Sequence, residues 1–95
     1  MDVEREFDLH DDEYLKFSRI ESPPSQRPDI CALLLIDKLL PKPGRDVISA
    51  AEHDVFYLAA DIEKFSEVAT VDDVIYLVRC GVHYDAESES LAMFV

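Results

Sequence analysis

Four residues have side chains that could bind a zinc ion: Cys31, His53, Cys80 and His83. Thiolates and imidazoles are ligand types that zinc prefers, and Cys80 and His83 stand three positions apart across a glycine. The chain has no CxxC or HxxxH pair, however, and Cys31 and His53 come from distant segments. Two reduced, buried thiols and two surface histidines explain these residues better, so we predict no metal and no other cofactor.

Nucleophilic catalysis has two candidate pairs, Cys80 with His83 and Ser49 with His53. Neither pair has a glycine-rich turn to expose the nucleophile, or an evident third group to orient the histidine. His83 and Asp85 would share one face of a strand, where they could transfer a proton or form only a surface ion pair. The sequence therefore predicts that the protein is not an enzyme.

Carboxylates stand out by number, because 21 Asp and Glu against 9 Lys and Arg give a formal net charge of −12. Such a chain repels nucleic acid and anionic membranes, so we predict neither as a direct partner. The formal net charge is −5 over residues 1–22, +2 over residues 23–45, −5 over residues 46–70 and −4 over residues 71–95. The bases of the second segment form one weakly basic zone: Arg27, Lys38, Lys42 and Arg45.

Some carboxylates recur at spacings that would gather them on one side of an element. Asp85, Glu87 and Glu89 would project from one side of an extended segment at intervals of about 6.8 Å. Glu63 and Glu67 would lie one turn apart on a helix, where like charges destabilise by a few tenths of a kcal/mol. This destabilisation suggests that the clustered negative charge serves a function. The alternative, which stays open, is a solvated surface that keeps the protein in solution.

We predict that these carboxylates contact a basic protein, together with an acidic run near the start of the chain and one tyrosine. Aromatic side chains usually lie in the core, but Tyr84 beside Asp85 could anchor an interface. The predicted partner-binding residues are Asp11, Asp12, Glu13, Glu63, Glu67, Tyr84, Asp85, Glu87 and Glu89.

A single domain over residues 1–95 must position these side chains, because the chain is too short for two. Residues 1–10 alternate polar and apolar side chains, which indicates a strand or an ordered acidic arm. The carboxylates of 11–13 predict the start of a helix whose apolar positions continue to Ile20. Three prolines exclude regular structure over 22–28.

Apolar spacing predicts four further helices, over residues 30–40, 47–52, 62–69 and 71–80. Residues that can cap the first three are Asp29, Asp46 and Asp61. The first is apolar around most of its circumference, which indicates a central helix, and exposed leucines on it could pair two copies of the chain. Thr70 with Asp73 resembles a capping box for the last, and Gly81 marks its end.

Strands are predicted where branched and aromatic residues form short runs. Residues 55–59 would be a buried strand, and 82–86 and 91–95 would form a hairpin around a polar tip. This order predicts an α+β domain in which a small, mostly antiparallel sheet of about three strands packs against four to five helices.

The C-terminal third, with DVIYLVRCGVHYD over 73–85 and the ending SLAMFV, resembles the tails of small acidic proteins from phages and mobile elements. This resemblance covers residues 50–95 and implies no catalytic residues. More broadly, a small acidic domain without an active site is similar in class to phage-encoded inhibitors of bacterial defence, anti-CRISPR proteins among them.

These patterns predict a non-enzymatic inhibitor in the bacterial cytoplasm. An acidic start is not a secretory signal, and the longest apolar run, residues 30–36, is too short to span a membrane. The acidic surface would act as a nucleic-acid mimic and block a basic groove on a host nuclease or surveillance complex. Two alternatives stay open: an immunity protein that neutralises a basic toxin, and a structural or assembly subunit of a phage particle.

Overall fold

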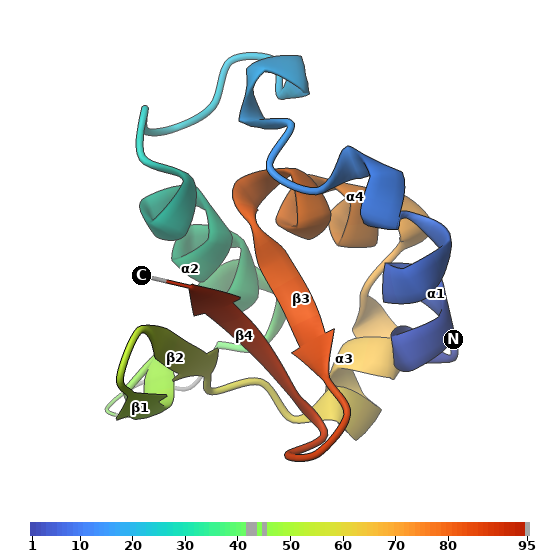
Figure 1. Cartoon of the computed structure of the whole chain (residues 1–95), viewed down its shortest axis with the longest axis vertical. Helices are drawn as coiled ribbons and strands as arrows, with labels where there is room; N and C mark the ends of the chain where they lie inside the picture. Colours follow the sequence, from blue (N-terminus) through green and yellow to red (C-terminus); the bar gives the residue numbers. More distant parts are fainter. Residues whose placement is uncertain (42–43, 45, 95) are drawn as a thin grey trace.

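Four helices and a four-stranded sheet make up most of the regular structure in the computed structural model, which describes residues 1–41, 44 and 46–94 (Figure 1). The helices are α1 (Val3–Leu9), α2 (Pro28–Leu39), α3 (Ile62–Val68) and α4 (Val71–Cys80). Two 3-10 turns, η1 (Asp11–Glu13) and η2 (Phe17–Arg19), separate α1 from α2. The strands are β1 (Ile48–Glu52), β2 (Val55–Leu58), β3 (Val82–Asp85) and β4 (Ser90–Phe94).

The sheet is antiparallel throughout and has the order β1-β2-β4-β3, so β3 lies at one edge. The predicted α+β class is confirmed, with one strand more than the expected three. The predicted C-terminal hairpin is confirmed as β3 and β4. Lys42, Arg45 and Val95, which belong to the predicted basic zone and the predicted last strand, lie outside the described residues.

Capping side chains explain where α3 and α4 begin. The Asp61 carboxylate accepts hydrogen bonds from two backbone amides at the start of α3. At the start of α4, the Thr70 hydroxyl accepts from the Asp73 amide at 3.2 Å, and the Asp73 carboxylate accepts from the Thr70 amide at 2.9 Å. These bonds satisfy amides that a helix start leaves unpaired, and they confirm both predicted caps.

Gly81 ends α4 in the left-handed region, at φ +100°, as predicted, and leads directly into β3. A Cβ at this position would lie 2.7 Å from Cδ2 of Leu15. We expect Gly81→Ala to lower the free energy of unfolding by about 1–3 kcal/mol, because an L-residue is strained at this φ and Leu15 must move.

Chemical denaturation of Gly81→Ala measures this loss, and Gly44→Ala is the matched control. Gly44 also has a positive φ, +81°, but among the described residues no atom lies within 4 Å of an added Cβ. Equal losses in the two variants would show that the contact with Leu15 adds nothing to the backbone strain.

Residues 1–10 contain helix α1, so the predicted strand or arm is wrong. The Asp2 carboxylate caps the helix by accepting from the Arg5 amide at 3.2 Å. Val3 and Phe7 are buried, and Leu9 is 57% exposed. The alternation of apolar residues pointed to a strand, but the two that are buried stand four apart, which is also the helical spacing.

The helix predicted from residue 11 onward is also wrong, because only η1 and η2 form there. Leu15 has φ 61°, which takes the backbone out of the right-handed helical region. Its amide donates instead to the carbonyl of Val78 in α4 at 3.1 Å. A tertiary hydrogen bond therefore replaces one that a helix would have made locally.

The helix predicted over residues 47–52 is a strand, β1. It pairs with β2 through a two-residue turn at His53 and Asp54, and His53 adopts φ 49°. Alanine and glutamate favour a helix locally, but pairing with β2 satisfies the backbone of this segment. Asp46 therefore caps no helix here.

Helix α2 begins at Pro28, with Arg27 as its N-cap, in place of the predicted Asp29. Proline suits the first helical position because its missing amide would have no partner there. The prediction of a central helix is confirmed in part, since one side of α2 is buried through Cys31, Ala32 and Ile36. On α2, the side chains of Ile30 and Leu34 remain 40% and 48% exposed. That two copies of the chain pair through the exposed side of α2 stays a prediction.

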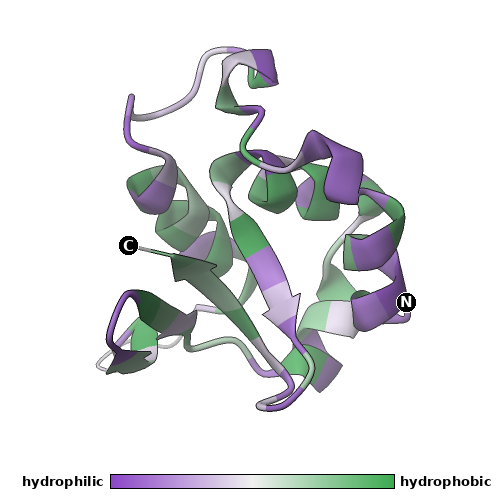
Figure 2. Ribbon diagram, viewed as in Figure 1, coloured by the Kyte–Doolittle hydropathy of each residue, from purple (hydrophilic) through white to green (hydrophobic). Residues whose placement is uncertain are grey.

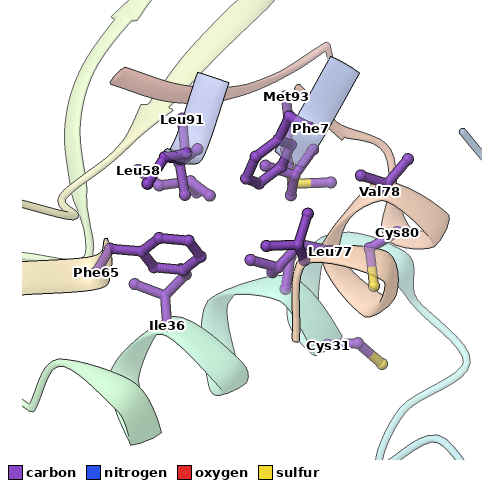
Figure 3. Close-up of a cluster of buried hydrophobic side chains, with 14 of the residues drawn as sticks. Phe7, Cys31, Ile36, Leu58, Phe65, Leu77, Val78, Cys80, Leu91 and Met93 are labelled. Carbon is purple, nitrogen blue, oxygen red and sulfur yellow. The ribbon is translucent and has the colours of Figure 1, made fainter. Parts of the chain in front are cut away.

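The core lies between the helices and one face of the sheet (Figure 3). Phe65 of α3 is 0% exposed, and its ring points toward Ile36 of α2 and Leu58 of β2. The ring centroid of Phe7 lies 6.3 Å from that of Phe65, so α1 and α3 meet through aromatic side chains. Contacts with α3, α4 and the strand β3 hold α1 beside the sheet.

Cys31 and Cys80 are both free and buried, which confirms the prediction of two buried thiols. They lie near each other where α2 meets α4 (Figure 3). Burial raises the pKa of the Cys80 thiol to about 12. At neutral pH this sulfur is a protonated core atom and not a nucleophile.

Candidate functional site

The start of the chain carries a dense run of negative charge. Residues 2–13 contain seven carboxylates and a single basic residue, Arg5. Figure 2 shows that hydrophilic residues dominate α1 and the turn after it. Because α1 contacts both η1 and the edge strand β3, these carboxylates lie along one edge of the sheet.

A groove of about 510 Å³ lies in this region, between α1 and β3. Four carboxylates line it, those of Asp2, Glu4, Asp8 and Asp11. The other lining residues are one cation, a histidine, two tyrosines and three apolar residues: Arg5, His83, Tyr14, Tyr84, Phe7, Val78 and Val82. This acidic groove thus combines negative charge with aromatic and apolar surface, which are the features of a protein-binding site.

Tyr84 stands between the carboxylates of the β3–β4 hairpin and those of α1. Burial raises the pKa of its phenol, and the negative charges of Glu89 and Glu4 raise it further, with smaller effects from Asp2 and Asp85. At neutral pH the phenol keeps its proton and can donate a hydrogen bond.

The structure brings two of the predicted partner-binding residues, Asp11 and Tyr84, into the acidic groove. Glu89 acts on Tyr84 from the hairpin turn, and Asp12 is exposed next to Asp11 on η1. Glu63 and Glu67 are exposed on α3, which contacts α1.

Asp85, Glu87 and Glu89 do not form the single extended row that their spacing predicted. Strand β3 ends at Asp85, and a turn follows in which Glu89 adopts φ 51°. Asp85 and Glu87 instead line a second hollow, on the other face of the hairpin from Tyr84. The hairpin therefore presents carboxylates to two surfaces.

Glu13, another predicted partner-binding residue, uses its carboxylate inside the chain. It accepts a hydrogen bond from Arg79 Nε at 2.7 Å and forms a second ion pair with Arg19. Its side chain is only 14% exposed. These contacts tie η1 to α4 and η2, so Glu13 positions the acidic segment more directly than it offers charge to a partner.

The hydrogen bond from Arg79 is the main reason why the pKa of Glu13 lies below its ordinary value of 4.5, and the charge of Arg19 lowers it further. Because this pKa is lower in the folded than in the unfolded chain, the ionised carboxylate stabilises the fold above pH 4.5. We expect this contribution to be lost as the pH falls through the folded pKa.

The check is the free energy of unfolding of the natural chain and of Glu13→Gln, measured from neutral pH to about pH 3. The natural chain should be the more stable one above pH 4.5, and the difference should shrink below it. A difference that does not change with pH would contradict this role for the carboxylate.

Three groove residues, Asp2, Glu4 and Asp8, were not among the predicted site residues. The signal was present, because Glu4 and Asp8 are spaced four apart and share one side of a helix. Interpreting residues 1–10 as a strand or arm concealed that spacing.

The candidate zinc ligands do not converge. Cys31 and Cys80 lie in the core, His53 is exposed in the β1–β2 turn, and His83 lies on the face of the sheet away from the core. Within residues 1–41, 44 and 46–94, no group of three or more His, Cys, Asp or Glu could hold a metal ion.

In the described residues, neither candidate catalytic pair is joined by a hydrogen bond between its nucleophile and its histidine. The Ser49 hydroxyl donates to the backbone carbonyl of Tyr57 at 3.3 Å. Burial lowers the pKa of His83 although Asp85 acts to raise it, and the Nδ1 atom of His83 is buried without a hydrogen-bond partner in the described part of the chain. The neutral imidazole of His83 therefore behaves as part of an aromatic surface.

The comparisons add no relative: no family model, curated protein or solved structure matches this chain. In the described part of the chain, no helix is both long and apolar enough to cross a bilayer. Function must therefore be argued from the surface itself.

Proposed function

We propose that this chain is a non-enzymatic binding protein whose acidic surface occupies a basic, nucleic-acid-binding groove on another protein. The observation that carries the proposal is the acidic groove, which four carboxylates, those of Asp2, Glu4, Asp8 and Asp11, line together with aromatic and apolar side chains. We further propose that the protein belongs to the class of anti-CRISPR-like inhibitors. It would act in the bacterial cytoplasm on a nuclease or surveillance complex.

The mechanism is competition for cations. Lysines and arginines of the target that otherwise bind phosphate pair with the carboxylates of α1 and the hairpin. Long-range attraction to a chain of net charge −12 speeds the encounter at low salt. Tyr84, with its protonated phenol and its buried side, then slows dissociation.

The test begins with the chain immobilised and a bacterial lysate applied and washed at increasing salt. The captured protein is purified, and its affinity for labelled DNA or RNA is measured with and without the chain. We expect the apparent dissociation constant for nucleic acid to rise in proportion to the chain's concentration, and the effect to fade at high salt.

A captured partner that binds nucleic acid equally well with the chain present would refute groove blocking. Capture of a small basic toxin would favour the immunity alternative. Co-purification with phage particles, insensitive to salt, would favour the structural alternative.

A further inference from the structure

The face of the sheet that points away from the core carries a second set of side chains. Across three neighbouring strands, the register places Tyr57 of β2 beside Ala92 of β4, and Ala92 beside His83 of β3. We call this the open face, and its residues used below are Glu52, Tyr57, His83, Asp85, Ala92 and Phe94.

Aromatic rings cover the part of the open face where the edge strand β3 pairs with β4. The rings of His83 and Phe94 stack with centroids 4.8 Å apart and an interplanar angle of 19°. Ala92 is 0% exposed although it does not belong to the core cluster, so side chains of the open face itself must cover it. Phe94 is 59% exposed. A partly exposed aromatic pair on an uncovered sheet face is typical of an interaction surface.

A hollow of about 390 Å³ lies at the hairpin end of the open face, beside Tyr57. Three carboxylates line it from three segments: Glu52 at the end of β1, Asp85 at the end of β3, and Glu87 in the turn. The Ser88 hydroxyl donates to the Asp85 carboxylate at 2.7 Å, which fixes that wall. Burial raises the pKa of Tyr57, and the charges of Asp85 and Glu52 raise it further, so these groups lie close to its phenol.

The negative charge and the aromatic ring of the hollow indicate which kind of group it would bind. Three carboxylates favour a cationic occupant, but in the described residues no such group is close enough together to hold a metal ion. A second copy of this chain that docked symmetrically through the same face would bring the same carboxylates into the contact and be repelled. An arginine side chain fits, because its planar guanidinium stacks on an aromatic ring and pairs with carboxylates at its edge.

We propose that the hollow binds an arginine side chain of a basic partner protein, with the guanidinium against Tyr57 and paired with Asp85, Glu52 and Glu87. The His83–Phe94 pair then packs against apolar surface next to that arginine. The partner's basic character rests on the proposed function, whereas the hollow itself is separate from the acidic groove.

The experiment uses the full chain, labelled with ¹⁵N, and two probes: oligoarginine and oligolysine peptides of equal length. We expect oligoarginine to shift the amide resonances of Glu52, Tyr57, Asp85 and Glu87 and to bind there about three- to tenfold more tightly than oligolysine. Equal affinities, or shifts confined to the acidic groove, would overturn the proposal.

Variants distinguish the contribution of the carboxylates to oligoarginine binding from the contribution of the Tyr57 ring. Glu52→Gln/Glu87→Gln should weaken oligoarginine binding at the hollow about tenfold, because two exposed ion pairs are lost. The matched control, Glu21→Gln/Asp37→Asn, removes the same charge from exposed positions elsewhere. It should change the affinity of the hollow for oligoarginine less than about twofold. Tyr57→Phe should keep the preference for arginine, and Tyr57→Leu should remove it. Equal losses in the charge variant and its control would also overturn the proposal.

A failure of the arginine site can be distinguished from a failure of the proposed function. If oligoarginine binds the hollow and the captured partner still binds nucleic acid freely, only groove blocking fails. If competition with nucleic acid holds and the hollow does not select arginine, only this inference fails.

Discussion

Phe65→Ala is expected to lower the free energy of unfolding by about 3–5 kcal/mol, the range for removing a fully buried aromatic ring. Phe65 is 0% exposed and joins α3 to α1, α2 and the sheet. A domain of this size has a total stability of roughly 5–15 kcal/mol, so the variant should be close to unfolding at physiological temperature. Urea denaturation followed by circular dichroism measures the change.

Phe94→Ala is the matched control, because it removes the same atoms from a side chain that is 59% exposed. We expect it to cost about 1 kcal/mol or less. Phe65→Leu keeps most of the volume and should cost less than Phe65→Ala. Similar losses at Phe65 and Phe94 would mean that the core is not organised around Phe65.

Glu4→Gln/Asp8→Asn/Asp11→Asn is expected to weaken binding to the proposed basic partner roughly 10- to 100-fold at low salt. This estimate assumes that each exposed ion pair contributes about 0.2–1 kcal/mol and that slower association adds to the loss. The affinity for the captured partner, measured at low and high salt, tests it. The loss should shrink as salt rises, because screening already weakens these contacts in the natural chain.

The control triple variant, Glu21→Gln/Asp37→Asn/Asp72→Asn, removes the same charge from exposed positions outside the acidic groove. It should lose only the part of the binding that depends on net charge. A second readout needs no partner: the groove variant should lower the raised pKa of Tyr84, because Glu4 helps to raise it. If the control weakens binding as much as the groove variant, total charge and not the acidic groove explains the binding.

Local signals predicted the fold from residue 55 onward well. Asp61, the Thr70–Asp73 box and Gly81 act on backbone groups within a few residues, so their effect can be inferred from spacing alone. The β3–β4 hairpin is similarly local. The two sites were predictable only in part, since Asp11, Tyr84, Asp85 and Glu87 were proposed as contacts without any indication of which surface each would join.

The sequence by itself determined the α+β class, the acidic surface and the ends of α3 and α4, because composition and capping act through short-range chemistry. Tertiary structure alone decided that residues 48–52 form a strand, since their backbone is satisfied by β2. It also decided that Glu13 pairs with Arg79, 66 positions away, and that carboxylates from three segments surround Tyr57. Such groupings depend on where distant segments pack, and neither periodicity nor propensity along the chain contains that information.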